Sequence, residues 1–558
     1  MPMDIPEMLR ELADLLELKG EDRFRVNAYR RAAASIENND VESIYNDSGL
    51  KGLMNIEGVG KGIAEKIEEA LKTGEIGELK ELKEEFPYEE LLSVPGVGPK
   101  TAAELYRRFG IKSVDELEKL ARDRRIRRLP GMGDKTETRI LQGIELWKTS
   151  RERKSLAYAS EIGKKVTKAL ETCGYAKKIS IAGSLRRGKE TIGDIDILVT
   201  SDHPERVIKT YTTMHGVQSV LMEGETRASV VMDGMRLDLR VVRDECFGSA
   251  LQYFTGSKEH SVRLREIAQR RGMKINEYGV FRDEERLGGR EEKDVYDALN
   301  MQFIPPEIRE NIGEIELAIE HRLPELAQNI KGDMHVHSKW SDGDASIREI
   351  AMKTKEMGYR YVAVCDHSKS LKVARGLDEK RLEARNREID SIDIEGVKVL
   401  KGMEVDILEN GSLDMDKKAL DDLDTVIAAV HTKLKMSEKD MTNRVIKALG
   451  NDVVDIFAHP TGVMAGRREG YRIDLARVAE ECDIAYEINC SSERMDLNSS
   501  GIRRIKEINR NALFSIGTDA HRIEQMDNAW IGIKLARRGM LEEKDLINSG
   551  EKAWKRRT

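Results

Sequence analysis

The sequence has few aromatic residues, few cysteines and no long hydrophobic run. A membrane-spanning helix needs about 20 predominantly apolar residues in succession, and no stretch of this chain provides them. The N-terminus also lacks the pattern of a signal peptide. Five cysteines, at positions 173, 246, 365, 482 and 490, are scattered and form no C-x-x-C pair, which argues against a disulfide scaffold. We therefore expect a cytoplasmic protein without a membrane partner.

Charge of one sign is not in large excess, because 94 Lys and Arg face 101 Asp and Glu. The distribution along the chain is uneven, however, and residues 91–160 hold 16 basic against 9 acidic side chains. Binding to DNA depends on local charge rather than on the total. The acidic total therefore does not exclude nucleic acid. It predicts modest, salt-sensitive binding to bare duplex, with selectivity that comes from gap geometry and end recognition.

A short pattern of two glycines around one apolar residue occurs three times in the helical first part of the chain, residues 1–157. A turn of this kind between two helices exposes backbone N–H groups at the start of the second helix, where they bind phosphate without reading sequence. One copy would equally suit a plain turn between helices. Three copies favour DNA binding and resemble helix-hairpin-helix motifs. The candidate DNA-binding residues are Gly58, Gly60, Gly96, Gly98, Lys100, Gly131 and Gly133.

Short apolar runs replace the helical pattern from about residue 178. Four of them predict strands, at residues 178–182, 194–200, 229–233 and 236–242. Residues 303–331 predict a connector with one helix. Beyond residue 333, apolar runs alternate with helical patterns, which favours a βα barrel or a parallel sheet with polar groups at the strand ends. These runs cover residues 361–365, 397–405, 425–430, 456–458, 485–488 and 513–516.

Two aspartates, Asp194 and Asp196, are separated by one residue in a predicted strand, so both side chains face the same side of it. Adjacent carboxylates repel each other unless a cation lies between them, and two divalent cations suit an in-line phosphoryl displacement. A lone pair of this kind also occurs at solvated strand ends. Asp238, on another predicted strand, offers a third carboxylate. The upstream loop offers backbone, hydroxyl and guanidinium groups for a triphosphate at Gly183, Ser184 and Arg187.

These motifs resemble those of the family X DNA polymerases, over most of residues 1–320. The resemblance also covers Gly20–Arg31, Tyr253–Ser257 and Ile275–Tyr278. It implies a metal-dependent nucleotidyltransferase that acts on gapped or primed DNA with dNTPs. It further implies a helical gap-binding domain (1–88), helix-hairpin-helix fingers (89–157), a palm (158–245) and a nucleotide-selecting subdomain (246–320).

The family pattern implies roles for single residues. Asp194 and Asp196 would bind both metals, Mg²⁺ or Mn²⁺, and Asp238 would bind the catalytic metal and activate the primer 3′-hydroxyl. The chain departs from polymerase beta where it reads Lys258-Glu-His-Ser261 in place of the Asp and Asn that contact the base, which leaves nucleotide selectivity open. The residues implied in nucleotide binding are Gly183, Ser184, Arg187, Gly193, Tyr253, Phe254, Gly256 and, on the template side, Arg265.

Lys66 follows the first hairpin and has two interpretations. Its amine could form a Schiff base with the aldehyde of an abasic site, and it matches the position of the lyase nucleophile of polymerase beta. The alternative is an ordinary solvated surface lysine. One matching lysine does not decide between them.

Six of the ten histidines lie in residues 331–558, and their clusters end predicted strands. A His-x-His pair on a strand places two imidazoles on one face, and neutral imidazole with carboxylate suits Zn²⁺, Mn²⁺ or Fe²⁺. A single histidine at a strand end is more often a core or surface residue. Five strand ends that share the feature predict a multinuclear metal site at one end of a barrel.

This half resembles the PHP (polymerase and histidinol phosphatase) domain over residues 334–558, after a linker at 321–333. The resemblance implies a distorted seven-stranded βα barrel with three divalent metals. It associates the domain with Mn²⁺-dependent 3′–5′ exonuclease, 3′-phosphatase and abasic (AP) endonuclease activities. The nine implied ligands are His335, His337, Asp342, His367, Glu404, His431, His459, Asp519 and His521.

The sequence therefore predicts a multidomain fold with an all-α helix-hairpin-helix region, an α+β nucleotidyltransferase and a C-terminal (βα)7 barrel. We expect a monomeric repair polymerase of a prokaryotic cytosol or nucleoid that fills short gaps and processes 3′ ends. Two alternatives stay open. The barrel could be a metal-stabilised scaffold or DNA clamp without turnover, and the first half could transfer nucleotides to an acceptor other than DNA.

Overall fold

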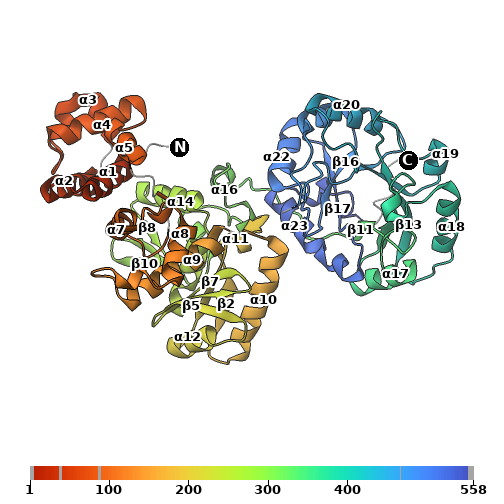
Figure 1. Cartoon of the computed structure of the whole chain (residues 1–558). Helices are drawn as coiled ribbons and strands as arrows, with labels where there is room; N and C mark the ends of the chain where they lie inside the picture. Colours follow the sequence, from red (N-terminus) through yellow and green to blue (C-terminus); the bar gives the residue numbers. More distant parts are fainter. Residues whose placement is uncertain are drawn as a thin grey trace. The chain divides into compact units, whose positions relative to one another are not determined.

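Helices alone make up the described part of the first unit, as the sequence predicts. The computed structural model describes residues 5–36, 41–85, 89–92, 94–151, 153–464 and 467–550. The chain divides into two compact units, Met1–Glu152 and Arg153–Thr558 (Figure 1). The first contains α1 (Ile5–Lys19), α2 (Arg23–Ile36), α3 (Val41–Met54), α4 (Lys61–Thr73), α5 (Gly77–Glu85), α6 (Glu89–Leu92), α7 (Pro99–Phe109), α8 (Val114–Arg122), the 3₁₀ turn η1 (Ile126–Arg128) and α9 (Asp134–Arg151).

The three glycine hairpins have the same backbone geometry. In each, the residue between the glycines donates its amide hydrogen to a carbonyl three residues earlier, at 3.0, 3.0 and 3.1 Å. The first glycine has a left-handed φ of +81°, +87° or +77°, which a side chain would strain. A Cβ on the second glycine would meet no described atom within 4 Å, so the space beside this glycine is free. The second glycines are Gly60, Gly98 and Gly133; the side chain of Lys100 lies outside the described part.

A five-stranded sheet begins the second unit, in the order β2-β4-β7-β6-β5. Ile195 and Ile197 on β4 are buried against helices α10 and α12, so Asp194 and Asp196, which alternate with them, face the other side. Strand β5 was not predicted. The elements are β1 (Lys154–Ser155), α10 (Leu156–Thr172), β2 (Lys178–Ile181), α11 (Gly183–Arg186), β3 (Thr191–Ile192), β4 (Asp194–Thr200), α12 (Pro204–Thr212), β5 (Val217–Glu223), β6 (Arg227–Met232) and β7 (Met235–Val242).

A smaller α+β segment follows this sheet and has its own buried core around Leu264, Tyr296 and Ile315. The predicted connector contains the expected helix α16 and, in addition, a short 3₁₀ turn, η3. The elements are η2 (Asp244–Cys246), α13 (Phe247–Thr255), α14 (Lys258–Arg270), β8 (Lys274–Asn276), β9 (Gly279–Arg282), β10 (Glu285–Gly288), α15 (Lys293–Ala298), η3 (Pro306–Ile308) and α16 (Glu314–Ile319).

Seven parallel strands form the C-terminal barrel, in sequence order from β11 to β17. A parallel bridge from Val336 to Ala520 brings the first and last strands together. Helices surround the strands (Figure 1). The elements are β11 (Gly332–Val336), α17 (Ile347–Glu356), β12 (Tyr361–Val364), η4 (Lys372–Ala374), α18 (Glu379–Asp390), β13 (Lys398–Asp406), α19 (Lys417–Asp421), β14 (Thr425–Ala429), α20 (Glu438–Leu449), β15 (Ile456–Phe457), α21 (Leu475–Glu481), β16 (Ala485–Asn489), α22 (Ser499–Ile508), β17 (Leu513–Gly517), η5 (Ile523–Asn528), α23 (Ala529–Arg538) and η6 (Glu543–Asp545).

The structure confirms the predicted fold class. Each predicted strand is present, and its ends agree with the prediction to within two residues. No helix of the described residues is long and apolar enough to cross a bilayer.

Candidate functional site

Three carboxylates lie side by side on the face of the first sheet that is opposite to α10 and α12. Asp194 and Asp196 are on β4, and the parallel register pairs Asp196 with Asp238 on β7. Burial, together with repulsion from Asp194 and Asp238, raises the pKa of Asp196 to about 7. Arg236 partly offsets the charge and lies 2.6 Å from Asp238. Burial and mutual repulsion both oppose the ionisation of these carboxylates. A divalent cation bound beside them would favour the ionised form, so the site suits such a cation.

A cavity of about 380 Å³ adjoins Asp194 and Asp196. The turn after β2 closes one side of it, where Gly183 has a φ of +60° and a Cβ would overlap the Asp196 carboxylate. Glycine is therefore required there. Gly193 precedes β4 and does not line the cavity. The other residues implied in nucleotide binding all line it: Gly183, Ser184, Arg187, Tyr253, Phe254, Gly256 and Arg265.

The residues at Lys258–Ser261, where the sequence departs from polymerase beta, have different surroundings in the structure. Lys258 and Ser261 line the cavity, whereas His260 faces away from it and is fully buried. His260 Nδ1 lies 2.7 Å from Glu314 Oε1, and its Nε2 lies 3.2 Å from the Tyr296 hydroxyl. Lys258 and the buried Ser261 are thus the residues of this segment that border the cavity beside Asp194 and Asp196.

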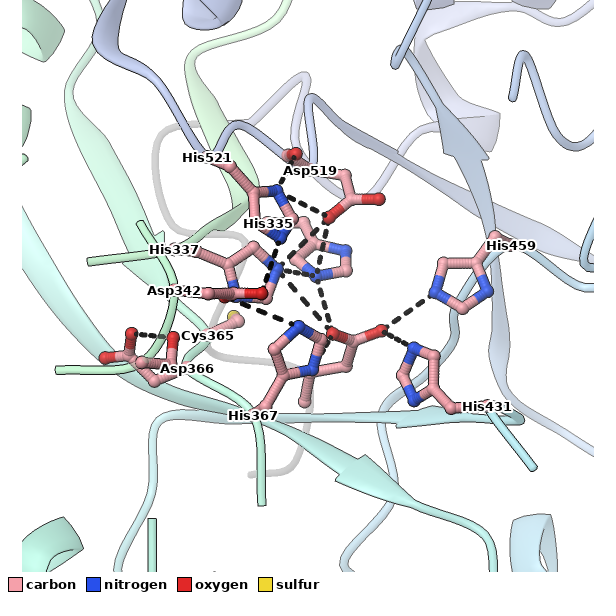
Figure 2. A network of polar contacts seen from close by, with 12 residues as sticks. His335, His337, Asp342, Cys365, Asp366, His367, His431, His459, Asp519 and His521 are labelled. Atoms are coloured by element: carbon pink, nitrogen blue, oxygen red, sulfur yellow. Dashed lines mark hydrogen bonds and ion pairs between the residues drawn. The ribbon is translucent and has the colours of Figure 1, made fainter. Parts of the chain in front are cut away.

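All nine side chains implied as metal ligands converge at one end of the barrel. Eight of them are labelled in Figure 2, and the ninth, Glu404, contacts His367 and His459 of this set. His335 lies on β11 and Glu404 on β13, and the other seven follow the carboxyl ends of strands or lie in the loops beyond them. A βα barrel brings these strand ends together, although they are up to 186 positions apart in sequence. Six are fully or almost fully buried, and His431, Asp342 and His521 are partly exposed at the mouth.

Seven of the nine side chains offer ligand atoms in three overlapping groups, each within 4.8 Å. His459 and Asp519 belong to none of these groups but contact Glu404 and His337, respectively. His337 Nε2 lies 3.1 Å from His335 Nε2 and 3.1 Å from Asp519 Oδ1, and Glu404 Oε1 lies 2.8 Å from His459 Nε2. The buried Nδ1 atoms of His337 and His459 have no hydrogen-bond partner in the described structure. Unpaired buried nitrogens beside carboxylates fit metal ions. The groups are His337, Asp342, His367 and His521; His335, His337 and Glu404; and His367, Glu404 and His431.

The pKa values of the cluster are shifted in both directions. Burial and the neighbouring imidazoles of His521 and His367 lower the pKa of His337 to about 4, which keeps it in the neutral form that binds metal. Burial would raise the pKa of Glu404, but the surrounding histidines hold it well below its ordinary value. Burial would lower the pKa of His431 and that of His521, but neighbouring carboxylates raise these pKa values to about 10 and about 9, so these two imidazoles would have to lose a proton to bind a metal.

Four buried or nearly buried residues surround the cluster in addition to the nine implied ligands; of these, the sequence places only Asp406 among the polar residues at the strand ends. His335 Nδ1 lies 2.6 Å from Glu487 Oε1 and His431 Nδ1 lies 2.8 Å from Asp406 Oδ1, contacts that point the Nε2 atoms inward. Asn489 donates to Glu487 and Asp519. Arg494 Nε lies 3.2 Å from Asp519 Oδ2, and its Nη1 has no partner in the described structure. Such a guanidinium can bind a phosphate oxygen.

One signal in the sequence could have found part of this set. The polar residues Glu487 and Asn489 alternate with apolar ones in the apolar strand β16, which is fully buried. Polar side chains in a buried strand need partners. No comparable signal marks Arg494, which lies in the loop after that strand.

Five family models match the chain. A helix-hairpin-helix domain covers residues 3–76 and a SAM-like helix-hairpin-helix tandem covers 88–145. The DNA polymerase beta palm covers 157–261 and the DNA polymerase beta thumb 250–310. The PHP domain covers 333–474.

Curated relatives match the same parts. The chain is 38% identical to "DNA polymerase/3′-5′ exonuclease PolX" of Bacillus subtilis (strain 168), over 98% of this chain and 97% of the relative. It is 26% identical to DNA polymerase lambda of Rattus norvegicus, over 55% of this chain and 56% of that one. It is also 31% identical to a "probable phosphatase" of Thermoanaerobacter sp. (strain X514), over 34% of this chain and 78% of the relative.

Proposed function

The chain belongs to the family X DNA polymerases that carry a C-terminal PHP domain, and we propose that it fills short gaps during base excision repair and processes 3′ ends. One observation supports the gap-filling activity. The cavity beside Asp194 and Asp196 is lined by a glycine-serine turn, an arginine and two aromatic side chains. This combination suits a nucleoside triphosphate. The three hairpins, with free space beside the second glycine of each, supply contacts to the DNA backbone.

In this proposal the side chains of the nucleotide site have distinct tasks. Asp194 and Asp196 would hold both metal ions, Mg²⁺ or Mn²⁺, which when bound neutralise charge on the phosphates and acidify the attacking hydroxyl. Asp238 lies beside Asp196; it would also hold the catalytic metal and would activate the primer 3′-hydroxyl by accepting its proton. Ser184 and Arg187 bind the triphosphate, and Tyr253, Phe254 and Gly256 bound the sugar. Transfer to DNA is favoured over another acceptor by the helix-hairpin-helix domains.

The barrel carries the second proposed activity, hydrolysis of phosphate esters at DNA 3′ ends or abasic sites. Its nine ligands would hold up to three divalent ions, Mn²⁺, Zn²⁺ or Fe²⁺, which when bound supply a hydroxide at neutral pH. Glu487 and Asp406 orient the imidazoles, and Arg494 receives phosphate. The unpaired Nη1 of Arg494 beside the ligand Asp519 favours turnover over the alternative of a metal-stabilised clamp. A "3′-5′ exonuclease" and a "probable phosphatase" among the relatives support the same assignment.

Primer extension tests the main proposal. With Mg²⁺ or Mn²⁺, we expect faster incorporation at a single-nucleotide gap than on an open primer-template, because the hairpins contact backbone on both sides of a gap. Chelation of the metal should stop the reaction. Incorporation that is equal on gapped and open substrates would contradict the gap-filling role, and no extension on either would contradict transfer to DNA.

A lyase activity can be tested with a variant at Lys66. In the structure its Nζ lies 3.4 Å from Glu69 and 3.5 Å from Glu78, and its side chain is 25% exposed. If it is the nucleophile, borohydride should trap the chain covalently on DNA with a 5′-deoxyribose phosphate, and Lys66→Ala should lose most of this product. Lys61→Ala, an exposed lysine on the same helix, is the matched control. If Lys66→Ala and Lys61→Ala were trapped to the same extent, Lys66 would not be the nucleophile, and its role would be that of an ion-pair partner of Glu69 and Glu78.

A further inference from the structure

Helix α23 of the barrel packs on the polymerase part of the second unit. It starts eight residues after His521, a ligand of the histidine cluster, and its last turn is basic. Lys534 and Arg537 both bind Glu307 of η3, with Nζ and Nε at 2.6 and 3.1 Å from Oε1. Burial would raise the pKa of Glu307, but these two cations lower it to about 2. An ionised, buried pairing therefore fixes this end of the barrel against the polymerase.

Arg538 reaches further than its neighbours, to the loop of the nucleotide site. Its Nη1 donates to the carbonyl oxygen of Arg187 at 2.9 Å, to that of Glu307 at 3.2 Å, and to Glu310 Oε1 at 3.1 Å. The residue is only 4% exposed. A guanidinium that serves three acceptors in a buried position holds them in one arrangement.

Glu310 joins Arg538 to Arg187. Its Oε1 also accepts from Arg187 Nε at 3.1 Å, and Arg187 Nη1 donates to the carbonyl oxygen of Thr255. Burial would raise the pKa of Glu310, but Arg187, Arg538 and Lys189 hold it below its ordinary value, so the carboxylate is charged. The orientation of Arg187 in the nucleotide cavity thus depends on a carboxylate that is shared with the barrel.

We propose that Arg538 is a positioning residue for the polymerase reaction, through which the PHP domain sets the affinity for the incoming triphosphate. It does not touch the substrate; it holds the main chain of Arg187 directly and the guanidinium of Arg187 through Glu310. This rests on the proposed function, in which Arg187 binds the triphosphate. Without Arg538, Glu310 would have only Arg187 and Lys189 as cationic partners, and it would draw Arg187 away from the nucleotide.

Steady-state incorporation at a single-nucleotide gap by the full chain tests this. In Arg538→Ala we expect the KM for dNTP to rise about tenfold, the size of one lost charge-assisted hydrogen bond, with kcat within about twofold of the parent. Arg538→Lys keeps the charge beside Glu310 and should recover part of the loss. Affinity for gapped DNA and hydrolysis of a 3′-phosphate should not change.

Three further variants distinguish the positioning of Arg187 from other causes of a raised KM. Arg537→Ala removes a cation from the same helix that does not contact Arg187, so its KM should stay within about twofold. Glu310→Gln should raise KM, and the double change with Arg538→Ala should add little, because both act on Arg187. Arg187→Ala measures the effect of the triphosphate contact itself.

An unchanged KM in Arg538→Ala, with a raised KM in Arg187→Ala, would overturn the positioning role alone. An unchanged KM in Arg187→Ala would overturn the assignment of Arg187 in the proposed function, and the positioning role with it. Equal KM effects of Arg537→Ala and Arg538→Ala would show a general loss of domain packing and would also overturn it. If Arg538→Ala fails to fold, Glu310→Gln and Arg538→Lys decide by the same criteria.

Discussion

Changing Asp194 and Asp196 together to asparagine is expected to abolish DNA extension and to leave hydrolysis by the barrel intact. The change keeps the shape of both side chains but removes the two charges that would hold cations beside the nucleotide cavity. Loss of transition-state charge stabilisation of this kind lowers kcat by on the order of 10³-fold or more. Burial and repulsion already raise the pKa of Asp196, so the neutral amides should not destabilise the sheet.

The measurement is single-turnover extension of a gapped primer by the variant and the parent, with release of phosphate from a 3′-phosphorylated primer as the second readout. Asp233→Asn is the matched control. Asp233 lies in the turn between β6 and β7 with a left-handed φ of +49°, which asparagine also tolerates. Residual extension within tenfold of the parent would contradict the aspartate site, and loss of both activities would contradict two independent sites.

The opposite separation is expected for the histidine cluster. His335→Ala removes an imidazole that contacts His337 and Glu404 in the buried centre of the cluster. Each ligand removed also leaves its partners unpaired, so we expect hydrolysis to fall by on the order of 10²-fold or more, while extension at a gap stays within about twofold of the parent.

Because His335 is fully buried, its removal could also destabilise the barrel. His521→Ala is therefore the second variant, since its side chain is 35% exposed and leaves little cavity. Metal content and thermal unfolding of both variants should be measured beside activity. His203→Ala, an exposed histidine outside the cluster, is the control. Retained hydrolysis in both cluster variants would contradict the histidine cluster as the hydrolytic site. A parent chain that binds metal but does not hydrolyse a 3′-phosphate would favour the scaffold or clamp alternative.

Much of the site could be predicted because its residues follow simple periodicities. The two-residue repeat of a strand places Asp194 and Asp196 on one face, and the structure has them there. Histidines at successive strand ends meet because parallel strands of a barrel end at one rim. In the first case the local spacing was enough, and in the second the alternation of strands and helices predicted which distant residues meet.

Other parts could not be predicted from local pattern. Strand β5 has mostly half-exposed residues and no clear alternation, so its sequence resembles a loop. His260 stands in a motif that contacts the nucleotide in polymerase beta, yet its partners Glu314 and Tyr296 come from later elements. Arg538 acts on Arg187 across 351 positions of sequence. These relations are decided by tertiary packing, which no short window of sequence contains.

The overlap among the three groups of candidate ligands has a consequence for the order in which metal ions would bind to the barrel. His337, His367 and Glu404 each belong to two groups, so an ion in one group changes the charge and the free lone pairs that the next ion meets. Ions that bind in these groups would therefore not load as independent equilibria. Binding of one ion should change the affinity for the next, so the ions should bind in a preferred order. If one ion were missing, the charge around the remaining ions would differ, and the hydrolytic activity would therefore not fall simply in proportion to the number of ions bound.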